Sequence, residues 1–336
     1  MVRDVRIEPA VVLAPMEGVT DICFRRVIRG IGGVGLTCTE FVASKGLTVG
    51  KARREWEMAA FDPDERPVSV QLFGREPELM ARAARLIQDR GATIIDINMG
   101  CPSKKVCSNS GGSALMAEPD RAVAIVRAVR AAIEIPLTVK MRSGFSQDAK
   151  NAPELAWRLQ EEGAEAIAIH WRTRADGYKG ERDITPIAEA VRRLSVPVIA
   201  NGDIVDVASA VRMRAETGCA GLMVGRGAIQ NPFILRQISQ AMAGEVPTQP
   251  SARELRLALF GYLDSLQERL GKEKVTVGRA KMMVKRLAVT LPGGDAVRLD
   301  VLRAQHLSAV RSVLDRWFDE LERAEDQSTP ASFAAP

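Results

Sequence analysis

The sequence predicts an α/β fold, a (β/α)8 TIM barrel followed by a small C-terminal helical domain. Short apolar runs alternate with longer helix-patterned segments from residue 11 to residue 225, and there are eight such runs. This alternation is typical of βα units around a parallel sheet, and eight repeats favour a closed barrel. With 336 residues and 46% apolar content, the chain can also bury the core of one large domain and a second, smaller one.

Each predicted strand is short and apolar, and the spacing leaves room for one helix between consecutive strands. We therefore expect a barrel domain over residues 1–240. The eight runs are VVLAP from Val11, GLTCTE from Gly35, PVSVQLFG from Pro67, TIIDINMG from Thr93, PLTVKMR from Pro136, AIAIHWR from Ala166, PVIANGD from Pro197 and AGLMVGRG from Ala220.

After the barrel, Gly244, Pro247 and Pro250 mark a linker, and apolar residues then recur at helical spacing. This pattern predicts three or four antiparallel helices in a domain over residues 251–325. The segment 326–336 has no apolar period, so we expect a disordered tail. The helical pattern is carried by Leu255, Leu259, Tyr262, Leu266 and Leu270, by Val277, Ala280, Val284 and Leu287, and by Val310, Leu314, Trp317 and Leu321.

Every predicted strand ends in residues suited to a functional site. The active site of a (β/α)8 barrel lies where the strands end and the following loops begin. One such residue alone could be a turn or capping residue, but eight strand ends in a row are hard to explain by capping. The residues are Met16, Glu17, Glu40, Gln71, Asn98, Cys101, Lys140, Arg142, His170, Arg172, Asn201, Asp203, Gly225 and Arg226.

Cysteine and histidine usage excludes several kinds of site. The five cysteines lie far apart without a CxxC pair, and the chain has only two histidines, His170 and His306. This fits neither a disulfide framework nor a zinc site, so we expect free thiols and chemistry without a metal. No stretch approaches the ~20 apolar residues of a membrane span, so we expect no membrane partner. A cytoplasmic monomer is the default expectation.

Cys101 is the candidate for a reactive thiol. It follows a buried strand in DINMGCPSKKV, in a loop at the predicted barrel mouth, with Lys104 and Lys105 nearby to influence its reactivity. A structural cysteine is the alternative, and it is the interpretation that we favour for Cys23, Cys38 and Cys219. Cys107 is a competing assignment, although it lacks the position at a strand end.

Lys140 and His170 end neighbouring strands. A buried ammonium without a partner is costly, so Lys140 needs a bound anion, an electron-rich cofactor ring or an internal salt bridge, for example with Glu40. His170 offers an imidazole donor at the next strand end, and a core histidine with its hydrogen bonds satisfied is the alternative.

The loops after the seventh and eighth runs carry NGD (Asn201 to Asp203) and GRG (Gly225 to Gly227). Glycines let backbone N–H groups approach an anion, and Arg226 can bind that anion with its forked guanidinium. TIM barrels commonly bind a phosphate group here. The pair of motifs therefore predicts phosphate binding, which suggests a nucleotide cofactor such as FMN.

Net charge is +5 with a pI of about 9.1, and much of the excess is local. Between Lys272 and Arg286 there are six basic residues and one acidic residue. In the helix predicted from about Val277, Arg279 and Arg286 form one stripe beside the apolar face, and Lys281 and Lys285 form another. Such stripes could straddle a phosphate backbone, and a solvated helix face is the alternative.

The motifs at the strand ends resemble those of the tRNA-dihydrouridine synthases, and most of all the bacterial B-type members. The resemblance covers about residues 9–240, while over the C-terminal helices it depends only on size, position and basic character. Trp171 departs from the family pattern, which more often has a small residue there. The matching motifs are APMEGVTD, FVASKGL, VQLFG, DINMGCPSKKV, GGSALM, VKMRSGF, IHWRTR, PVIANGDI and GRGAIQNPF.

The resemblance implies a barrel that binds FMN, takes electrons from NADPH and reduces a uridine in the D-loop region of tRNA. Cys101 would be the general acid, Asn98 and Arg142 would orient the uracil, and Arg172 would reach either the RNA or the FMN phosphate. The isoalloxazine would contact Pro15, Met16 and Gln71, with Lys140 and His170 beside the ring. Glu17 would also belong to the cofactor site, and the FMN phosphate would contact Asn201, Gly202, Asp203, Gly225 and Arg226.

The implied chemistry is consistent with these residue types. Hydride delivery to C6 of uracil leaves negative charge that an acid must quench by protonating C5, and a free thiol is largely protonated at neutral pH. The base must be pulled out of the RNA, and a basic helical domain would help. Two alternatives stay open. One is a flavin barrel acting on a free small molecule, as dihydroorotate dehydrogenases and ene-reductases do, and the other is a non-catalytic RNA-binding protein.

Overall fold

The structure is a computed structural model, and it describes residues 1–49, 53–107 and 111–328. Nine strands occur within these ranges, all paired in parallel. They are β1 (Val11–Leu13), β2 (Leu36–Cys38), β3 (Val42–Ala43), β4 (Val68–Phe73), β5 (Ile94–Met99), β6 (Leu137–Arg142), β7 (Ala166–His170), β8 (Val198–Asn201) and β9 (Gly221–Val224).

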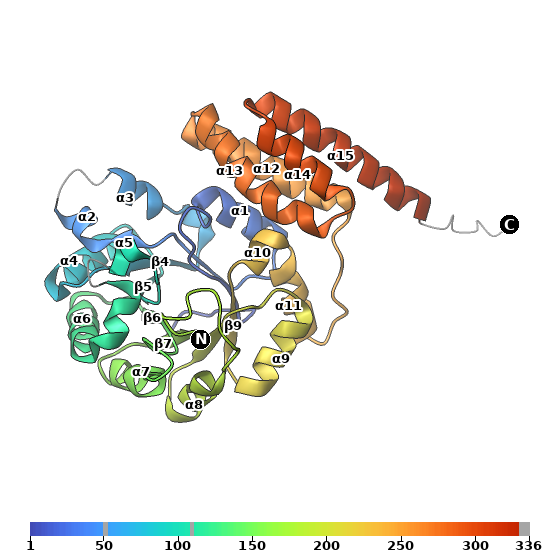
Figure 1. Ribbon diagram of the computed structural model, residues 1–336. Coiled ribbons are helices and arrows are strands. Elements are labelled where there is room, and N and C mark those ends of the chain that lie inside the picture. Colours follow the sequence, from blue (N-terminus) through green and yellow to red (C-terminus); the bar gives the residue numbers. More distant parts are fainter. Residues whose placement is uncertain (50–52, 108–110, 329–336) are drawn as a thin grey trace.

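Eight of these strands close into a barrel. The sheet runs in the order β2-β1-β9-β8-β7-β6-β5-β4, and β2 also pairs with β4, which completes the ring (Figure 1). Each of the eight apolar runs contributes one of these strands, so the predicted (β/α)8 barrel is confirmed. The ninth strand, β3, was not predicted. It pairs with β4 at Val42 and Leu72, so it continues the barrel wall where β2 ends.

Helices separate the strands and cover the outside of the barrel (Figure 1). Several begin where the sequence supplies a start signal: proline opens α4 and α6, and Asp206 with Ser209 forms a capping box on α9. They are α1 (Ile22–Ile31), α2 (Ser44–Thr48), α3 (Arg53–Met58), α4 (Pro77–Gln88), α5 (Lys104–Cys107), α6 (Pro119–Ala132), α7 (Ala152–Glu161), α8 (Thr185–Arg193), α9 (Val207–Thr217), α10 (Gly227–Gln230) and α11 (Ile234–Met242), with 3-10 turns at Pro63–Glu65 and Gly112–Ala117.

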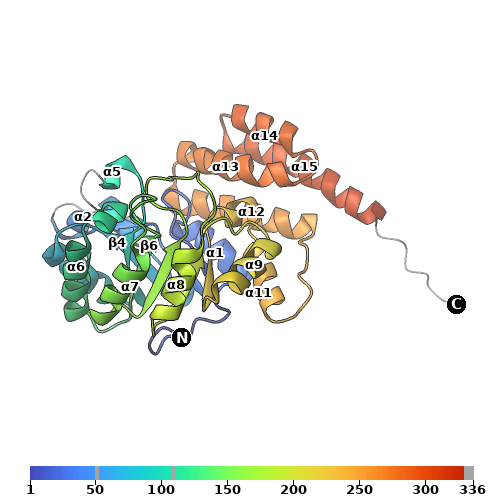
Figure 2. The same ribbon diagram turned by 60° about the horizontal axis from the view of Figure 1, so that its bottom comes forward.

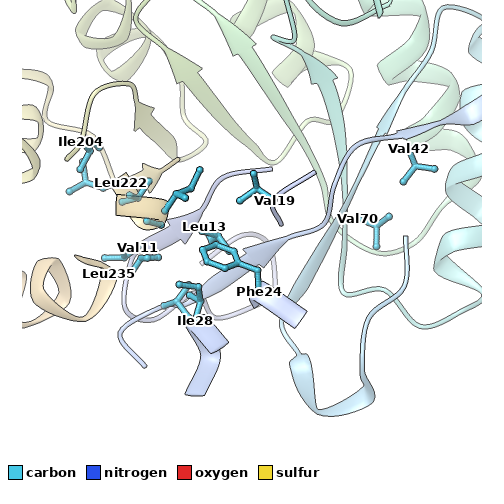
Figure 3. Close-up of a cluster of buried hydrophobic side chains, with 14 of the residues drawn as sticks. Val11, Leu13, Val19, Phe24, Ile28, Val42, Val70, Ile204, Leu222 and Leu235 are labelled. Carbon is cyan, nitrogen blue, oxygen red and sulfur yellow. The ribbon is translucent and has the colours of Figure 1, made fainter. Parts of the chain in front are cut away.

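Side chains alternate between the two faces of the barrel wall. Val11 and Leu13 of β1 point outward and pack against Phe24 and Ile28 of α1 in the main core (Figure 3). Small and medium apolar side chains point inward and fill the lower interior, and the N-terminal segment packs against them. The inward set is Val12, Ala14, Leu36, Cys38, Ile94, Ala168 and Met223, with Val5, Ile7 and Ile199 packed against it.

The C-terminal region is helical, as predicted. Its four helices are α12 (Ala252–Leu270), α13 (Glu273–Leu287), α14 (Gly294–Arg303) and α15 (Leu307–Ser328), with a 3-10 turn at Ala288–Thr290. A Ser251/Glu254 capping box starts α12, and left-handed Gly271 ends it. Leu259 and Tyr262 of α12 are buried among apolar side chains of the other helices and of α1.

The last helix extends past the predicted start of the disordered tail. Residues 326–328 belong to α15, whereas we expected disorder from Asp326 onward. The physical reason lies one residue earlier, where the Glu325 carboxylate accepts hydrogen bonds of 2.8 and 3.0 Å from the backbone N–H of Ala252 and fixes this part of α15 to the start of α12. The rest of the predicted tail, residues 329–336, lies outside the described residues.

The helical region packs beside the carboxyl ends of the strands. Helix α12 contacts α1, and α13 contacts α10, so the contacts involve the segments that follow β1 and β9. Figure 2 shows the helical region on the opposite side of the barrel from the N-terminus. None of the described helices is both long and apolar enough to cross a membrane. The basic helix α13 is therefore near the face where a TIM barrel places its active site.

Candidate active site

Polar side chains occupy the upper interior of the barrel. Strand pairing aligns Gln71 with Asp96 and Asp96 with Thr138, and one step higher it aligns Asn98 with Lys140. At the top, Arg142 pairs with His170 and His170 with Asn201. Because these positions share the inward face of β4 to β8, residues that are distant in the sequence meet at one end of the barrel.

A chain of hydrogen bonds joins the middle of this interior to Cys101. The Thr138 hydroxyl donates to Asp96 over 2.6 Å, and the Gln71 amide nitrogen donates to the other Asp96 oxygen over 2.5 Å. The Asn98 amide nitrogen donates to the Gln71 oxygen over 2.7 Å. The Asn98 oxygen accepts from the Cys101 N–H over 2.9 Å. Asn98 thus positions the Cys101 backbone, and its hydrogen bond to Gln71 holds Asn98 itself in place.

Sequence reasoning missed Asp96 and Thr138 as members of this cluster. Asp96 is 5% exposed, and burial raises the pKa of its carboxyl group while the hydrogen bonds from Gln71 and Thr138 oppose that effect. The alternation along β5 carries the signal, because Asp96 and Asn98 are two residues apart and therefore share a face.

Cys101 is half-buried and free, and its loop is held on several sides. Its carbonyl oxygen accepts from the Ser113 hydroxyl over 2.9 Å and from the Ser113 N–H over 3.1 Å. The Cys107 thiol also lies 3.4 Å from that oxygen. Cys107 therefore faces the backbone of Cys101 and supports the loop. The side chains of Lys104 and Lys105 lie outside the described residues.

The Lys140 ammonium has no ion-pair or hydrogen-bond partner within residues 1–49, 53–107 and 111–328. Burial lowers its pKa to about 8, and the positive charge of Arg142 adds to that effect. The salt bridge to Glu40 that we considered does not form, since the Glu40 carboxylate accepts from the Gly18 N–H instead. A half-buried cation without a partner among the described residues therefore remains at the centre of the site, which a bound ligand can satisfy.

His170 is held in one orientation. Its Nδ1 accepts a hydrogen bond of 3.1 Å from the Arg172 N–H, so in the neutral ring Nε2 carries the proton. Burial lowers the pKa of His170 well below its usual value, and the cations Lys140 and Arg142 act in the same direction. The imidazole is thus a neutral donor at the barrel mouth.

Asp203 joins two arginines at the rim formed by the β7, β8 and β9 loops. Arg172 contacts its two carboxylate oxygens at 2.9 and 2.6 Å, and Arg226 contacts one of them at 2.9 Å. These cations lower the pKa of Asp203, which opposes the effect of its burial. Two cations and one anion leave an excess of positive charge beside Gly202 and Gly225.

Trp171 lies below this rim and outside the interior of the barrel. Its ring is 2% exposed, and the Arg172 guanidinium stacks 3.9 Å from the ring centroid. Gly202 has φ of +117°, and a Cβ there would lie 2.4 Å from Trp171 Cδ1. The large indole is therefore accommodated by packing against a residue that has no side chain.

The β1 loop approaches the rim from the other side. Met16 is half-buried, and its sulfur would lie 3.8 Å from a Cβ at Gly225. Pro15 is also half-buried and Glu17 is exposed, so both are at the surface of the mouth. The predicted FMN residues from β1 and β9 thus lie next to each other.

The four basic residues predicted to contact RNA separate into two kinds. Arg279 points at the barrel, where it donates to the Gly18 carbonyl and lies 3.5 Å from the Asp21 carboxylate. Lys281 is half-buried, and Lys285 and Arg286 are exposed. Of the residues that the structure describes, none forms an ion pair with these three. They stay available for an anionic partner, while Arg279 attaches α13 to the β1 loop.

Two cavities lie elsewhere on the barrel. One of about 470 Å³ lies between α9 and α11, and another of about 720 Å³ lies at the amino ends of the strands near Arg3 and Pro136. Neither contains a residue of the polar cluster. We place the site elsewhere, because the first cavity is lined mainly by apolar residues and the second lies at the amino ends of the strands, opposite the face where a TIM barrel has its active site. The described residues also contain no group of three or more His, Cys, Asp or Glu side chains that could hold a metal.

Comparison with known proteins identifies the family. The family model described as dihydrouridine synthase (Dus) matches residues 12–315. The chain belongs to the dihydrouridine synthase family. It is therefore an oxidoreductase acting on a CH–CH group, and the match extends through the barrel and most of the helical region.

The names of individual relatives are consistent with this family match. The chain is 40% identical to a protein named probable tRNA-dihydrouridine synthase from Rhodobacter capsulatus over 95% of this chain and 98% of that protein. It is 38% identical to tRNA-dihydrouridine synthase B from Xanthomonas axonopodis pv. citri over 94% of each. In fold it is similar to morphinone reductase in complex with tetrahydroNAD, with a TM-score of 0.52 and 13% identity, over 75% of this chain and 92% of that one.

Proposed function

We propose that this protein is a tRNA-dihydrouridine synthase that uses FMN and NADPH to reduce the C5–C6 bond of uridines in the tRNA D-loop, with Cys101 as the general acid. The observation that carries the proposal is the held Cys101 loop beside the unpaired Lys140 ammonium inside the barrel mouth. Family membership and the names of the relatives support the choice of tRNA over a free small molecule and over a non-catalytic role.

The polar residues of the mouth suit a flavin. Lys140 is a half-buried cation without a partner among the described residues, which favours an electron-rich ring beside it, and neutral His170 would donate to that ring. When bound, reduced FMN would supply a hydride to C6 of the uracil. The ring would contact Pro15, Met16, Glu17 and Gln71, and the phosphate would lie at Asn201, Gly202, Asp203, Gly225 and Arg226.

Cys101 is suited to deliver one proton. Its backbone N–H is held by Asn98 and its carbonyl by Ser113, so the backbone that carries the thiol is fixed on both sides. The Sγ proton would pass to C5 of the uracil after hydride has arrived at C6. A fixed donor lowers the orientational cost of that transfer.

RNA contact would come from the helical domain and the rim. Lys281, Lys285 and Arg286 carry charge without an ion-pair partner among the described residues, on a helix near the carboxyl end of the barrel. A uridine in a folded tRNA is stacked, so it must leave the stack to reach Cys101. Phosphate contacts by α13 would hold the RNA while the base enters the mouth.

The test of the chemistry is a spectral titration of the purified protein. NADPH should bleach the flavin bands, and unmodified tRNA should restore them without oxygen. Cys101→Ala should keep the flavin and its reduction by NADPH but lower dihydrouridine formation by 10² or more, the usual size of general-acid catalysis. Cys107→Ser is the matched control and should stay close to the wild type. Flavin that tRNA never reoxidises would remove the proposed activity.

The test of the RNA surface is the salt dependence of tRNA binding. Replacing Lys281, Lys285 and Arg286 with alanine should weaken binding and lower the slope of log K against log salt by about 2, since each phosphate contact contributes about 0.7 to 0.9. The control variant removes three arginines from the outer helices α8 and α9, namely Arg192, Arg212 and Arg214. Equal effects in both variants would argue against a site on α13.

A further inference from the structure

We propose that Arg142 is a positioning residue that couples the Cys101 loop to the loop between β7 and α8. The sequence resemblance places Arg142 near the uracil, and the inference depends on the proposed role of Cys101 as the acid. Arg142 ends β6 and is 4% exposed. The hydrogen bonds of its guanidinium indicate its role.

The guanidinium joins two loops that are far apart in the sequence. Nε donates to the Gly100 carbonyl over 2.7 Å, immediately before Cys101. Nη1 donates to the Thr173 carbonyl over 2.7 Å and to the Gly177 carbonyl over 3.0 Å. Among the described residues only Nη2 has no hydrogen-bond partner, so most of this side chain holds backbone rather than substrate.

One side of the coupling is the peptide before the proposed acid. Arg142 holds the Gly100 carbonyl, while the Asn98 oxygen accepts from the N–H groups of Gly100 and Cys101 at 3.1 and 2.9 Å. The peptide unit is thus held on its carbonyl side by β6 and on its amide side by β5. Losing either partner would leave a buried backbone group without a hydrogen bond.

The other side is a turn at the rim. Asp176 accepts from the Thr173 N–H over 2.8 Å, which closes the turn that presents the Thr173 and Gly177 carbonyls to Arg142. The ring of Tyr178 in the same loop is 65% exposed and lies 5.1 Å from the guanidinium of Arg226. The loop thus extends from the arginine rim to Arg142, and through Arg142 to the Cys101 loop.

Arginine is required for this arrangement. A planar guanidinium presents donors in several fixed directions, whereas a lysine ammonium is a compact point at the end of a flexible chain. Arg142→Lys keeps the positive charge but cannot reach the Gly100 and Thr173 carbonyls in the same geometry. The variant therefore separates charge from coupling.

The experiment uses the FMN-free protein without RNA, in a Cys107→Ser background. The other three cysteines are buried, so iodoacetamide reports on Cys101. Trypsin cleavage at Arg174 and Lys179 reports on the rim loop. Arg142→Lys should accelerate both reactions on the order of tenfold, as expected when a hydrogen bond from a charged donor is lost.

Two further variants separate coupling from general loosening. Arg172→Lys is the matched control, because Arg172 holds the Lys179 carbonyl at 2.8 Å and Asp203 but not Gly100. It loosens the Lys179 end of the loop but leaves the turn that Arg142 holds in place, so it should accelerate trypsin cleavage at Lys179 and leave cleavage at Arg174 and alkylation unchanged. Asp176 is half-buried, and Asp176→Ala opens the turn. It should accelerate both reactions, although Asp176 makes no hydrogen bond to the described residues of the Cys101 loop.

The inference is overturned if Arg142→Lys changes only one reaction, or if Asp176→Ala leaves Cys101 alkylation at the wild-type rate. Asp176→Ala keeps the test valid if Arg142→Lys does not fold. Because neither readout needs flavin, NADPH or tRNA, coupling can hold even if the protein reduces no uridine. A failed spectral titration and a failed coupling test are therefore distinguishable.

Discussion

Lys140→Met should stabilise the FMN-free protein at neutral pH. Burial lowers the pKa of Lys140 from 10.5 to about 8, although the side chain is half-buried and keeps some contact with solvent. Since a tenfold change in proton affinity corresponds to about 1.36 kcal/mol, keeping this ammonium protonated costs the folded state up to about 3 kcal/mol. Methionine has a similar length and no charge, so replacing the lysine should raise the free energy of unfolding by up to about that amount at pH 7.

The direction of the pKa shift determines how the stability difference between the two proteins depends on pH. The folded state binds the Lys140 proton more weakly than the unfolded state, so the wild-type protein gains stability as pH rises from about 8 to about 10.5. The cost is fully present below about pH 8 and is gone above 10.5. The stability advantage of Lys140→Met should therefore be largest at pH 7 and disappear near pH 10.5.

The assay is urea unfolding of the two FMN-free proteins at pH 7 and pH 10, followed by tryptophan fluorescence. Taking the difference between variants cancels the titration of groups that they share. Lys285→Met, at an exposed lysine of α13, is the control for the substitution itself. An advantage of zero at pH 7, or one that stays the same at both pH values, would refute the reasoning. With FMN present, the wild type should be stabilised more than the variant.

The remaining predictions concern the rim and the helical region. Gly202→Ala should destabilise the protein by about 1 to 3 kcal/mol, because φ is +117° and the new Cβ meets Trp171; adding Trp171→Leu should recover the steric part in thermal unfolding. Arg279→Ala should destabilise by about 1 kcal/mol, because Arg279 attaches α13 to the β1 loop. It should leave the salt dependence of tRNA binding unchanged, and a lowered slope in filter binding would instead return Arg279 to the RNA surface.

The strands and helices could be predicted from sequence because their signals are local. Each apolar run is a few residues long, and a buried parallel strand needs little more than such a run between turn residues. β3 was missed because it has only two residues, Val42 and Ala43, and such a segment has no period to detect. The same limit applies at Asp326, where helix or coil depends on how the neighbouring Glu325 is held by a distant backbone N–H.

The candidate site was predictable in its location but not in its hydrogen bonds. Polar strand ends must meet at the mouth of a closed barrel, so listing them was enough to place the site. Asp96 was missed since it lies inside an apolar run, where only the alternation of β5 puts it beside Gln71. Glu40 is a possible partner for Lys140 on sequence alone, but its carboxylate accepts from the Gly18 N–H, because the β1 loop brings that N–H close to it.

The sequence by itself determined the barrel, the helical region, the family and the set of polar residues at the mouth. The tertiary structure decided which of these side chains remain free. Lys140 has no partner among the described residues, whereas Arg142 and Arg279 use their donors on backbone carbonyls. The reason is physical: a side chain's type is written in the sequence, but its hydrogen-bond partners are the groups that folding brings within about 3 Å of it, and here they come from loops distant along the chain.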